Sequence, residues 1–403
     1  MPNIQPFQRT LTQQLATLAQ SWRLVFLTGP RQSGKTTLAR MALPDAEYLT
    51  FENPATRELA TADPRAILAQ IQGKSAILDE VQHAPHLFSW LQQHIDERRG
   101  GPMILTGSQN FRMSERIGQT LAGRGAILEL LPLSMAELVR RPARHPDTWL
   151  DGGQPFLPKG DAESVDTVLF RGFYPRLHAD DLAPSDFYAS YVQTYVERDV
   201  RTLVDVGDLD AFTRFLMLAA GRAGQLVNLS SLGSEAGVSH KTADRWLAVL
   251  RASYVIELLQ PWHESFSKRV VKAPKLMFLD TGLLCWLLRI RGADDLRSHP
   301  LRGSIFENFV YSELRKLHLH HGVRPDLWFW RDSAGHEVDF VVAAHGRRIP
   351  IEAKSGMTVT PGTFAGLDWW CKTSGEPGGV LVHGASEATP FRAHLGRSWG
   401  DIT

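Results

Sequence analysis

Cysteine is the scarcest residue type in this chain, with 2 among 403 residues. Cys285 and Cys371 lie far apart in sequence, each in apolar or aromatic company, which favours buried free thiols in a reducing compartment over a disulfide or a zinc site. A secretory signal pattern is also missing, and the most apolar segment, 275–289, is interrupted by Asp280 and Gly282. We therefore expect a cytoplasmic protein without a membrane span.

An excess of either charge is missing as well, since 44 Lys and Arg residues face 43 Asp and Glu residues, for a net charge of +1. This balance excludes a global attraction to nucleic acid or to a membrane, so any basic binding surface has to be local. The 403 residues are 43% hydrophobic and can bury sizeable cores, and the length predicts two to three domains.

What the sequence does contain is a complete phosphate-binding loop at residues 29–37. Its G-x-x-x-x-G-K-[ST] pattern lies between a short apolar strand, 23–28, and a helix that continues over 38–42, which is the order this motif requires. In that geometry backbone N–H groups and the helix dipole face the phosphates. Lys35 is predicted to reach the β and γ phosphates, and Thr36 to be a ligand of Mg²⁺. The predicted ATP-binding residues are Gly29, Pro30, Arg31, Gln32, Ser33, Gly34, Lys35, Thr36 and Thr37.

Two acids, Asp79 and Glu80, end the short apolar run 75–80. The run predicts a second parallel strand whose carboxyl end faces the phosphates. Asp79 is then expected to hold Mg²⁺ through its water shell, and Glu80 to polarise the attacking water as the general base. An Asp-Glu pair after a strand is common by itself, but behind a complete phosphate loop it indicates hydrolysis rather than mere binding.

Two more polar residues are candidates for catalysis. Ser108 follows the apolar run 102–106, where its side chain can sense the γ-phosphate or orient the water, although a polar turn after a buried strand uses the same residue types. Arg124 lies in a glycine turn and is a candidate cation for transition-state charge, in its own chain or for a neighbour. A solvated arginine is the alternative for Arg124.

Strands that alternate with helices predict an α/β fold for residues 1–140, a doubly wound parallel sheet that carries the phosphate loop. Its ligand is expected at the carboxyl ends of the strands. The expected strands are 23–28, 47–51, 75–80, 102–106 and 125–131.

The middle of the chain predicts two further parts. Residues 141–222 start with a stretch rich in Pro, Gly and Asp and continue with helices, as in a linker and helical connector. Residues 223–262 have the pattern of a helix-turn-helix followed by a strand, which is typical of a winged helix. In a DNA-binding module the second helix would face the major groove, whereas other winged helices are spacers between proteins. The residues expected on its exposed face are Ser239, His240, Lys241, Thr242 and Arg245.

Residues 263–403 predict a mixed α/β domain with a second group of charged side chains. Glu307 lies on an amphipathic helix, and Asp339, Glu352 and Lys354 lie on two strands of a hairpin, where alternation puts Glu352 and Lys354 on one face and lets Asp339 meet them. The arrangement resembles the PD-(D/E)XK nuclease core. In such a site the carboxylates hold one or two Mg²⁺ or Mn²⁺ ions that activate water, and the lysine positions the nucleophile. A hairpin with solvated charges is the alternative.

With these residues in place, the whole chain resembles a large prokaryotic family of AAA-type ATPases that carry a C-terminal domain of unknown function. The matching stretches are 29–37, 78–82, 105–109, 121–124, 171–175, 195–200, 278–282 and 303–308. The resemblance implies ATP binding in a bacterial or archaeal cytoplasm but supplies no substrate. The chain lacks the arginine pair that follows the core in AAA unfoldases, so its oligomeric state stays open.

Taken together, these patterns predict an Mg²⁺-dependent ATPase whose nucleotide state controls a winged-helix and nuclease-like half acting on nucleic acid. The alternative is a nucleotide-dependent switch that binds DNA or a partner protein without cleaving it.

Overall fold

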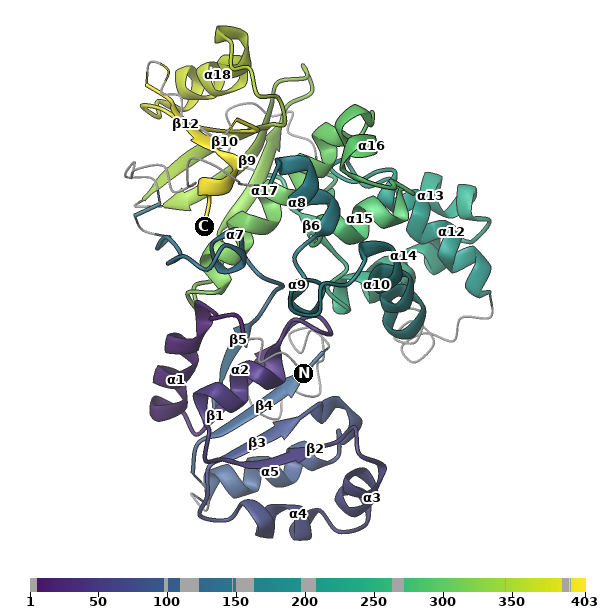
Figure 1. The fold of residues 1–403 in the computed structure, drawn as a ribbon, viewed down its shortest axis with the longest axis vertical. Helices are drawn as coiled ribbons and strands as arrows, with labels where there is room; N and C mark the ends of the chain where they lie inside the picture. Colours follow the sequence, from purple (N-terminus) through teal and green to yellow (C-terminus); the bar gives the residue numbers. More distant parts are fainter. Residues whose placement is uncertain are drawn as a thin grey trace. The chain divides into compact units, whose positions relative to one another are not determined.

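A computed structural model describes residues 6–97, 101–108, 123–146, 148–149, 163–196, 208–262, 272–344, 346–385, 391 and 393–403 (Figure 1). The chain groups into two compact units. The first comprises Met1–Leu133, Ala252–Tyr254 and Leu319–Val323, and the second Ser134–Arg251, Val255–His318 and Arg324–Thr403. The domain limits given above stay predictions, and residues 150–162 of the expected linker lie outside the described residues.

The first unit is built on a five-stranded sheet with the strand order β2-β3-β4-β1-β5. All neighbouring strands in it run parallel, which confirms the predicted parallel α/β sheet. Each expected strand lies within two residues of its observed bounds. These are β1 (Leu24–Thr28), β2 (Glu47–Thr50), β3 (Ala76–Asp79), β4 (Met103–Gly107) and β5 (Ala126–Glu129).

Helices cover both faces of this sheet, and the alternation of side chains along β1 shows how. Val25 and Leu27 belong to the apolar cluster that includes residues of α1 and α2, whereas Leu24 and Phe26 belong to the cluster under α3, α4 and α5. Because both faces are buried, the strand reads as a continuous apolar run. The helices are α1 (Leu11–Ser21), α2 (Lys35–Ala42), α3 (Pro54–Ala62), α4 (Pro64–Ile71) and α5 (Leu87–Asp96).

The second unit starts with short helices. Among the helices expected in the connector, α10 is followed by a π-helical turn over Val192–Val196, and residues 197–207 lie outside the described part of the chain. The helices of this part are α7 (Met135–Leu138), α8 (Val165–Arg171), α9 (Pro175–Ala179), α10 (Pro184–Tyr191), α15 (Thr281–Leu287) and α16 (Ala293–Ser298).

A helix-turn-helix with an adjoining strand pair forms part of this unit. It contains α12 (Leu209–Ala220), α13 (Leu229–Ala236) and α14 (His240–Ala252), and β6 (Ile256–Leu259) pairs antiparallel with β7 (Lys275–Phe278). Trp246 of α14 packs edge-on against Phe212 and Phe215 of α12, with ring centroids 5.4 and 5.5 Å apart. Exposed polar side chains therefore remain on the other side of α14.

The last part of the second unit is a five-stranded mixed sheet with the order β12-β11-β10-β9-β8. Strands β8, β9 and β10 are antiparallel neighbours, and β10, β11 and β12 are parallel neighbours. Helix α17 (Arg302–Leu319) stacks Tyr311 on Phe340, and α18 (Ala365–Ser374) packs Trp370 on Trp330. The strands are β8 (Leu327–Arg331), β9 (Glu337–Ala344), β10 (Arg347–Lys354), β11 (Val380–His383) and β12 (Leu395–Ser398).

The structure also bears on the two cysteines and on the question of a membrane-spanning helix. Both cysteines are free thiols, Cys285 buried and Cys371 partly exposed. Throughout the described ranges, the structure contains no helix with the length and apolar character that crossing a membrane requires.

Candidate functional site

The phosphate loop leaves the carboxyl end of β1 and enters α2. Gly29 has a φ of 148°, and a Cβ atom there would lie 2.1 Å from the carbonyl oxygen of Leu130, so only glycine fits. Lys35 is 4% exposed, and its Nζ donates to the carbonyl oxygens of Gly29 (3.0 Å) and Pro30 (2.7 Å). The loop is thus already curled around the amine that is predicted to meet the phosphates.

Arg9, which precedes β1, also holds the phosphate loop in place, a role that the sequence did not reveal. Its guanidinium donates to the carbonyl oxygens of Ser33 (2.6 Å) and Leu131 (2.7 Å) and is buried. Since charge-assisted hydrogen bonds are roughly twice as strong as neutral ones, Arg9 ties the loop to the chain segment that follows β5. No pattern around position 9 points to this contact.

Oxygen donors gather around Asp79 at the carboxyl end of β3. Thr36 Oγ1 donates to Asp79 Oδ1 (2.9 Å), Tyr48 Oη donates to Asp79 Oδ2 (2.7 Å), and Thr106 Oγ1 also donates to the carboxylate. Burial, and then the hydrogen bond to Asp79, raise the pKa of Tyr48. Hydroxyl and carboxylate oxygens suit Mg²⁺, which when bound would neutralise charge on the β and γ phosphates. Tyr48 and Thr106 were not predicted.

Glu80 has an unusual backbone conformation for a residue with a side chain, with φ 56° and ψ 47°. A left-handed conformation costs a non-glycine residue roughly 1–2 kcal/mol, and such strain is concentrated at functional sites. The Glu80 N–H donates to Thr106 Oγ1 (3.2 Å), which fixes this conformation. The Glu80 carboxylate reaches Ser108, the residue that follows β4.

The Glu80 carboxylate is held by two polar side chains. Ser108 Oγ donates to Glu80 Oε2 (3.1 Å), and Gln82 Nε2 donates both to Glu80 Oε2 and to Ser108 Oγ (3.0 Å). Burial opposes ionisation, but the charges of Lys35 and Arg31 and these hydrogen bonds outweigh it and lower the pKa of Glu80. An ionised, oriented carboxylate beside the phosphate loop has the properties of a general base.

Arg124 lies away from this group, which corrects the expectation that it serves its own site. It precedes β5 and forms an ion pair with Asp96 at the end of α5 (2.8 Å). Because Val25 pairs with Ala126 and Thr28 with Glu129 in parallel register, Arg124 lies at the amino edge of the sheet, opposite the phosphate loop. Only action on a neighbouring chain remains as a prediction for it.

In the second unit, the four residues predicted for a nuclease-like site lie in one connected cluster. Lys354 Nζ contacts Glu352 Oε2 (2.7 Å) and Asp339 Oδ2 (3.6 Å), and the N–H of Ala353 donates to Asp339 Oδ2 (2.9 Å). Glu307 on α17 joins through Lys275 of β7, whose Nζ lies 2.8 Å from Glu307 Oε1 and 3.9 Å from Asp339 Oδ1.

Two members of this acid cluster were missed in the sequence, Lys275 and Glu337. Their atoms Nζ and Oε1 lie 2.5 Å apart. Lys275 precedes Glu307 by 32 positions, and no motif connects it with the other residues. The pairing of β7 with β6 places Lys275 beside the carboxylates. Only the tertiary structure reveals that a buried ammonium lies among these carboxylates.

Burial in the cluster raises two carboxyl pKa values. Burial, together with the charge of Asp339, raises the pKa of Glu352 to about 8, and burial, opposed by Lys275, raises the pKa of Glu307 to about 7, both from an ordinary 4.5. The charges of Lys275 and Lys354 outweigh burial and lower the pKa of Asp339. Asp339 is therefore the ionised centre of the group.

These shifts predict that the second unit loses stability as the pH rises from 4.5 to about 8. A carboxyl with a raised folded pKa contributes its stability fully below the unfolded pKa and loses it as the pH passes the folded value, at up to about 1.4 kcal/mol per pH unit. Thermal unfolding between about pH 5 and pH 9 measures the slope. Glu352→Gln should flatten the profile, and an unchanged slope in this variant would contradict the shift.

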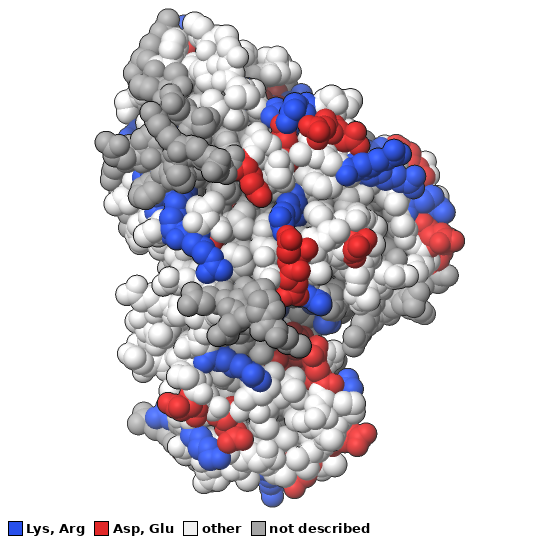
Figure 2. Space-filling model, in the orientation of Figure 1, with Lys and Arg blue, Asp and Glu red and all other residues white. Residues whose placement is uncertain are grey.

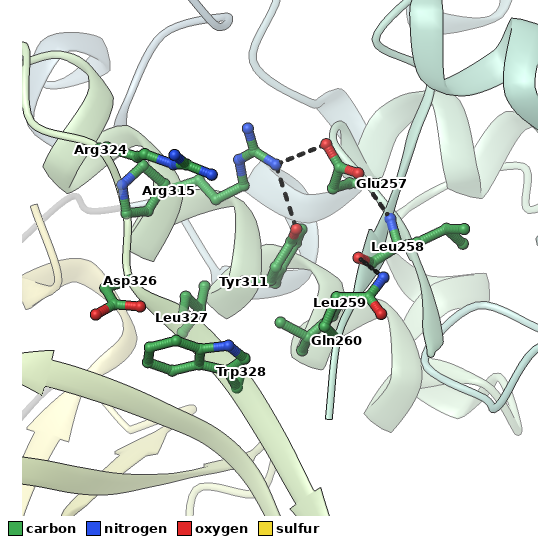
Figure 3. Close-up of a pocket in the computed structure, with 11 residues that line it drawn as sticks. Glu257, Leu258, Leu259, Gln260, Tyr311, Arg315, Arg324, Asp326, Leu327 and Trp328 are labelled. Carbon is green, nitrogen blue, oxygen red and sulfur yellow. Dashed lines mark hydrogen bonds and ion pairs between the residues drawn. The ribbon is translucent and has the colours of Figure 1, made fainter. Parts of the chain in front are cut away.

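A pocket of about 550 Å³ lies elsewhere in the second unit, between the end of β6, α17 and β8 (Figure 3). On its wall Arg315 contacts Glu257 Oε2 (2.9 Å) and the Tyr311 hydroxyl (3.4 Å). Burial raises the pKa of Glu257, but the charge of Arg315 leads the effects that outweigh it and lower that pKa. The Arg315 charge is thus neutralised within the wall. Arg324, Asp326 and Trp328 also line the pocket.

Three segments of the chain match known protein families. Residues 21–139 match the family described as an AAA domain. Residues 162–294 and 302–396 match two families described as domains of unknown function, DUF8612 and DUF4143. The phosphate loop, Asp79 and Glu80 all lie within the first of these segments.

Relatives along most of the chain are uncharacterized proteins of Mycobacterium bovis and Mycobacterium tuberculosis. Each is 32% identical over 341 residues, which is 83% of this chain and 71% of the relative. Solved structures similar to it include the Walker-type ATPase of Pyrococcus abyssi, with 13% identity, 72% of this chain and 99% of that chain covered and a TM-score of 0.46. Another is NtrX of Brucella abortus in complex with ATP, with 16% identity and a TM-score of 0.28. That match covers 62% of this chain and 69% of NtrX. These two structural likenesses are too weak to bear on function.

Proposed function

We propose that this chain, an ATP hydrolase that belongs to the family of the two mycobacterial relatives and matches an AAA domain over residues 21–139, controls through its nucleotide state a C-terminal half that binds nucleic acid. Hydrolysis on this proposal depends on Mg²⁺ held by Thr36 and Asp79. Glu80 takes the proton of the attacking water, Lys35 binds the phosphates, and Ser108 and Gln82 orient Glu80.

The exposed side of α14 carries the nucleic-acid part of the proposal. Ser239, His240, Lys241 and Arg245 are exposed, and Thr242 is partly exposed. The second helix of a helix-turn-helix presents such side chains to the major groove, and the β6 and β7 pair follows α14 as the wing does in a winged helix. Lys and Arg are interspersed with Asp and Glu on the face in view in Figure 2. The proposed contact with nucleic acid is therefore a local one, the exposed side of α14.

We expect the double variant Lys241→Ala, Arg245→Ala to bind duplex DNA more weakly than the wild type. Each lost phosphate contact lowers the slope of log K against log salt by about 0.9, so the titration is run at several salt concentrations. Lys372→Ala, which removes an exposed lysine on α18, is the matched control. Nucleotide control requires that affinity differ between ATP and ADP. Equal, salt-independent binding by all variants would exclude α14 as the contact.

A second function, metal-dependent cleavage of nucleic acid, is favoured by one observation, the connected cluster of Glu307, Asp339, Glu352 and Lys354. Labelled DNA incubated with ATP and Mg²⁺ or Mn²⁺ separates the two functions in the same preparations. Cleavage by the wild type that disappears in Asp339→Ala supports the nuclease. Salt-sensitive binding without cleavage supports the switch.

A further inference from the structure

The acid cluster of the second unit has a cation at its centre that belongs to the chain itself. Lys275 Nζ lies 2.5 Å from Glu337 Oε1, 2.8 Å from Glu307 Oε1 and 3.9 Å from Asp339 Oδ1. The Lys275 side chain is only 3% exposed. Three carboxylates from α17 and β9 thus converge on one buried ammonium, in the manner in which carboxylates converge on a metal ion.

The backbone around Lys275 holds the ammonium in this place. β7 pairs with β6 along its length, from Lys275 opposite Leu259 to Phe278 opposite Ile256. The N–H of Phe278 donates to Asn308 Oδ1 (2.6 Å), which ties β7 to α17 next to Glu307. The strand is therefore fixed to the helix that carries one of the three carboxylates, and Lys275 is part of the packed structure.

A divalent metal does not fit this arrangement. Mg²⁺ needs oxygen ligands at about 2.0–2.1 Å in near-octahedral geometry, and the carboxylate oxygens here are instead spaced around a hydrogen-bonding ammonium. Among the residues that the structure describes, no three His, Cys, Asp or Glu side chains come together in a way that could hold a metal ion. A metal entering beside Lys275 would also face a buried positive charge.

We propose that the ammonium of Lys275 occupies the metal position of the acid cluster, so that this cluster takes no divalent cation while β7 is in place. The cluster is then a closed ionic core that joins β7, α17 and the hairpin of β9 and β10. Divalent metals gain access only when Lys275 is removed or displaced. The inference does not depend on ATP hydrolysis or on DNA binding. It opposes metal-dependent cleavage at the acid cluster, so cleavage by the wild type that disappears in Asp339→Ala would contradict it.

Mn²⁺ binding to the full-length protein tests the proposal without nucleotide, with free Mn²⁺ measured by electron paramagnetic resonance. All proteins carry Asp79→Asn so that the nucleotide site does not contribute. In this background, the protein with no further change and the Asp339→Asn variant should bind the same amount of Mn²⁺, because the acid cluster holds none. Lys275→Met should gain one bound ion per chain, and Mn²⁺ should raise its unfolding temperature, because ligands that bind the folded state stabilise it. Lys275→Arg, which keeps the cation, should gain none.

Lys354→Met is the matched control, since it removes the more exposed lysine of the cluster, 45% against 3%, and leaves Lys275 in place. The proposal is overturned if the protein with Lys275 intact binds an Mn²⁺ ion that Asp339→Asn removes, or if folded Lys275→Met binds none. Should Lys275→Met fail to fold, the comparison of the Lys275-containing protein with Asp339→Asn and Lys275→Arg still decides the outcome.

Discussion

Glutamine in place of Glu80 is expected to abolish ATP turnover and leave ATP binding intact. The substitution keeps the shape of the side chain and its contacts with Ser108 and Gln82 but removes the carboxylate that we propose as the acceptor of the water proton. A positioned general base contributes about 10²–10⁴-fold to rate, so kcat should fall by at least about 100-fold. The dissociation constant for ATP should stay within about threefold, a difference under 1 kcal/mol.

Steady-state phosphate release and equilibrium binding of a fluorescent ATP analogue measure the two quantities. Glu58→Gln makes the same chemical change at an exposed position of α3 and should leave both unchanged. Hydrolysis by Glu80→Gln at the wild-type rate would remove Glu80 from the mechanism. Loss of ATP binding in this variant would instead give Glu80 a role in holding the loop, through its strained backbone and its bond to Thr106.

The sequence predicted which residues of the candidate nucleotide site come together, because its parts are local or lie at equivalent strand ends. The phosphate loop is one continuous stretch, and Asp79, Glu80 and Ser108 each follow an apolar strand, so a parallel sheet brings them to one edge. Tyr48 and Arg9 were missed because nothing in their surroundings marks them. Arg124 was misplaced because a glycine turn does not say which edge of the sheet it adjoins.

The acid cluster shows the same division in the second unit. Glu352 and Lys354 were paired correctly by strand alternation, and the hairpin carried Asp339 to them. Lys275 arrives from a different strand pair, and its charge changes what the carboxylates can do. The motif of acids and a lysine covers only residues of one hairpin. The pKa values of these carboxylates also depend on charged residues of every other element packed around them.

The largest effect on stability is expected from the buried pair Glu313 and Lys316 of α17, whose side chains are 0% exposed and 2.9 Å apart. Glu313 Oε2 also accepts from the N–H of Met135 (2.8 Å) and the hydroxyl of Thr403 (2.8 Å). Glu313 thus joins α7, α17 and the last described residue of the chain. Removing it leaves the Lys316 ammonium without its counter-ion and two further donors without an acceptor.

Glu313→Leu should therefore lower the free energy of unfolding of the second unit by about 3–5 kcal/mol, the range for breaking one partner of a buried pair. Lys316→Met should cost less, because Glu313 keeps two donors. The double variant should cost less than the sum of the two, since it leaves no unpaired charge. Urea unfolding measures all three, and Arg176→Ala, which breaks an exposed pair with Asp180, should change stability by under about 0.5 kcal/mol. A Glu313→Leu effect as small as that of Arg176→Ala would mean that the pair adds nothing beyond an ordinary surface contact, and that α17 is held in place by its apolar face alone.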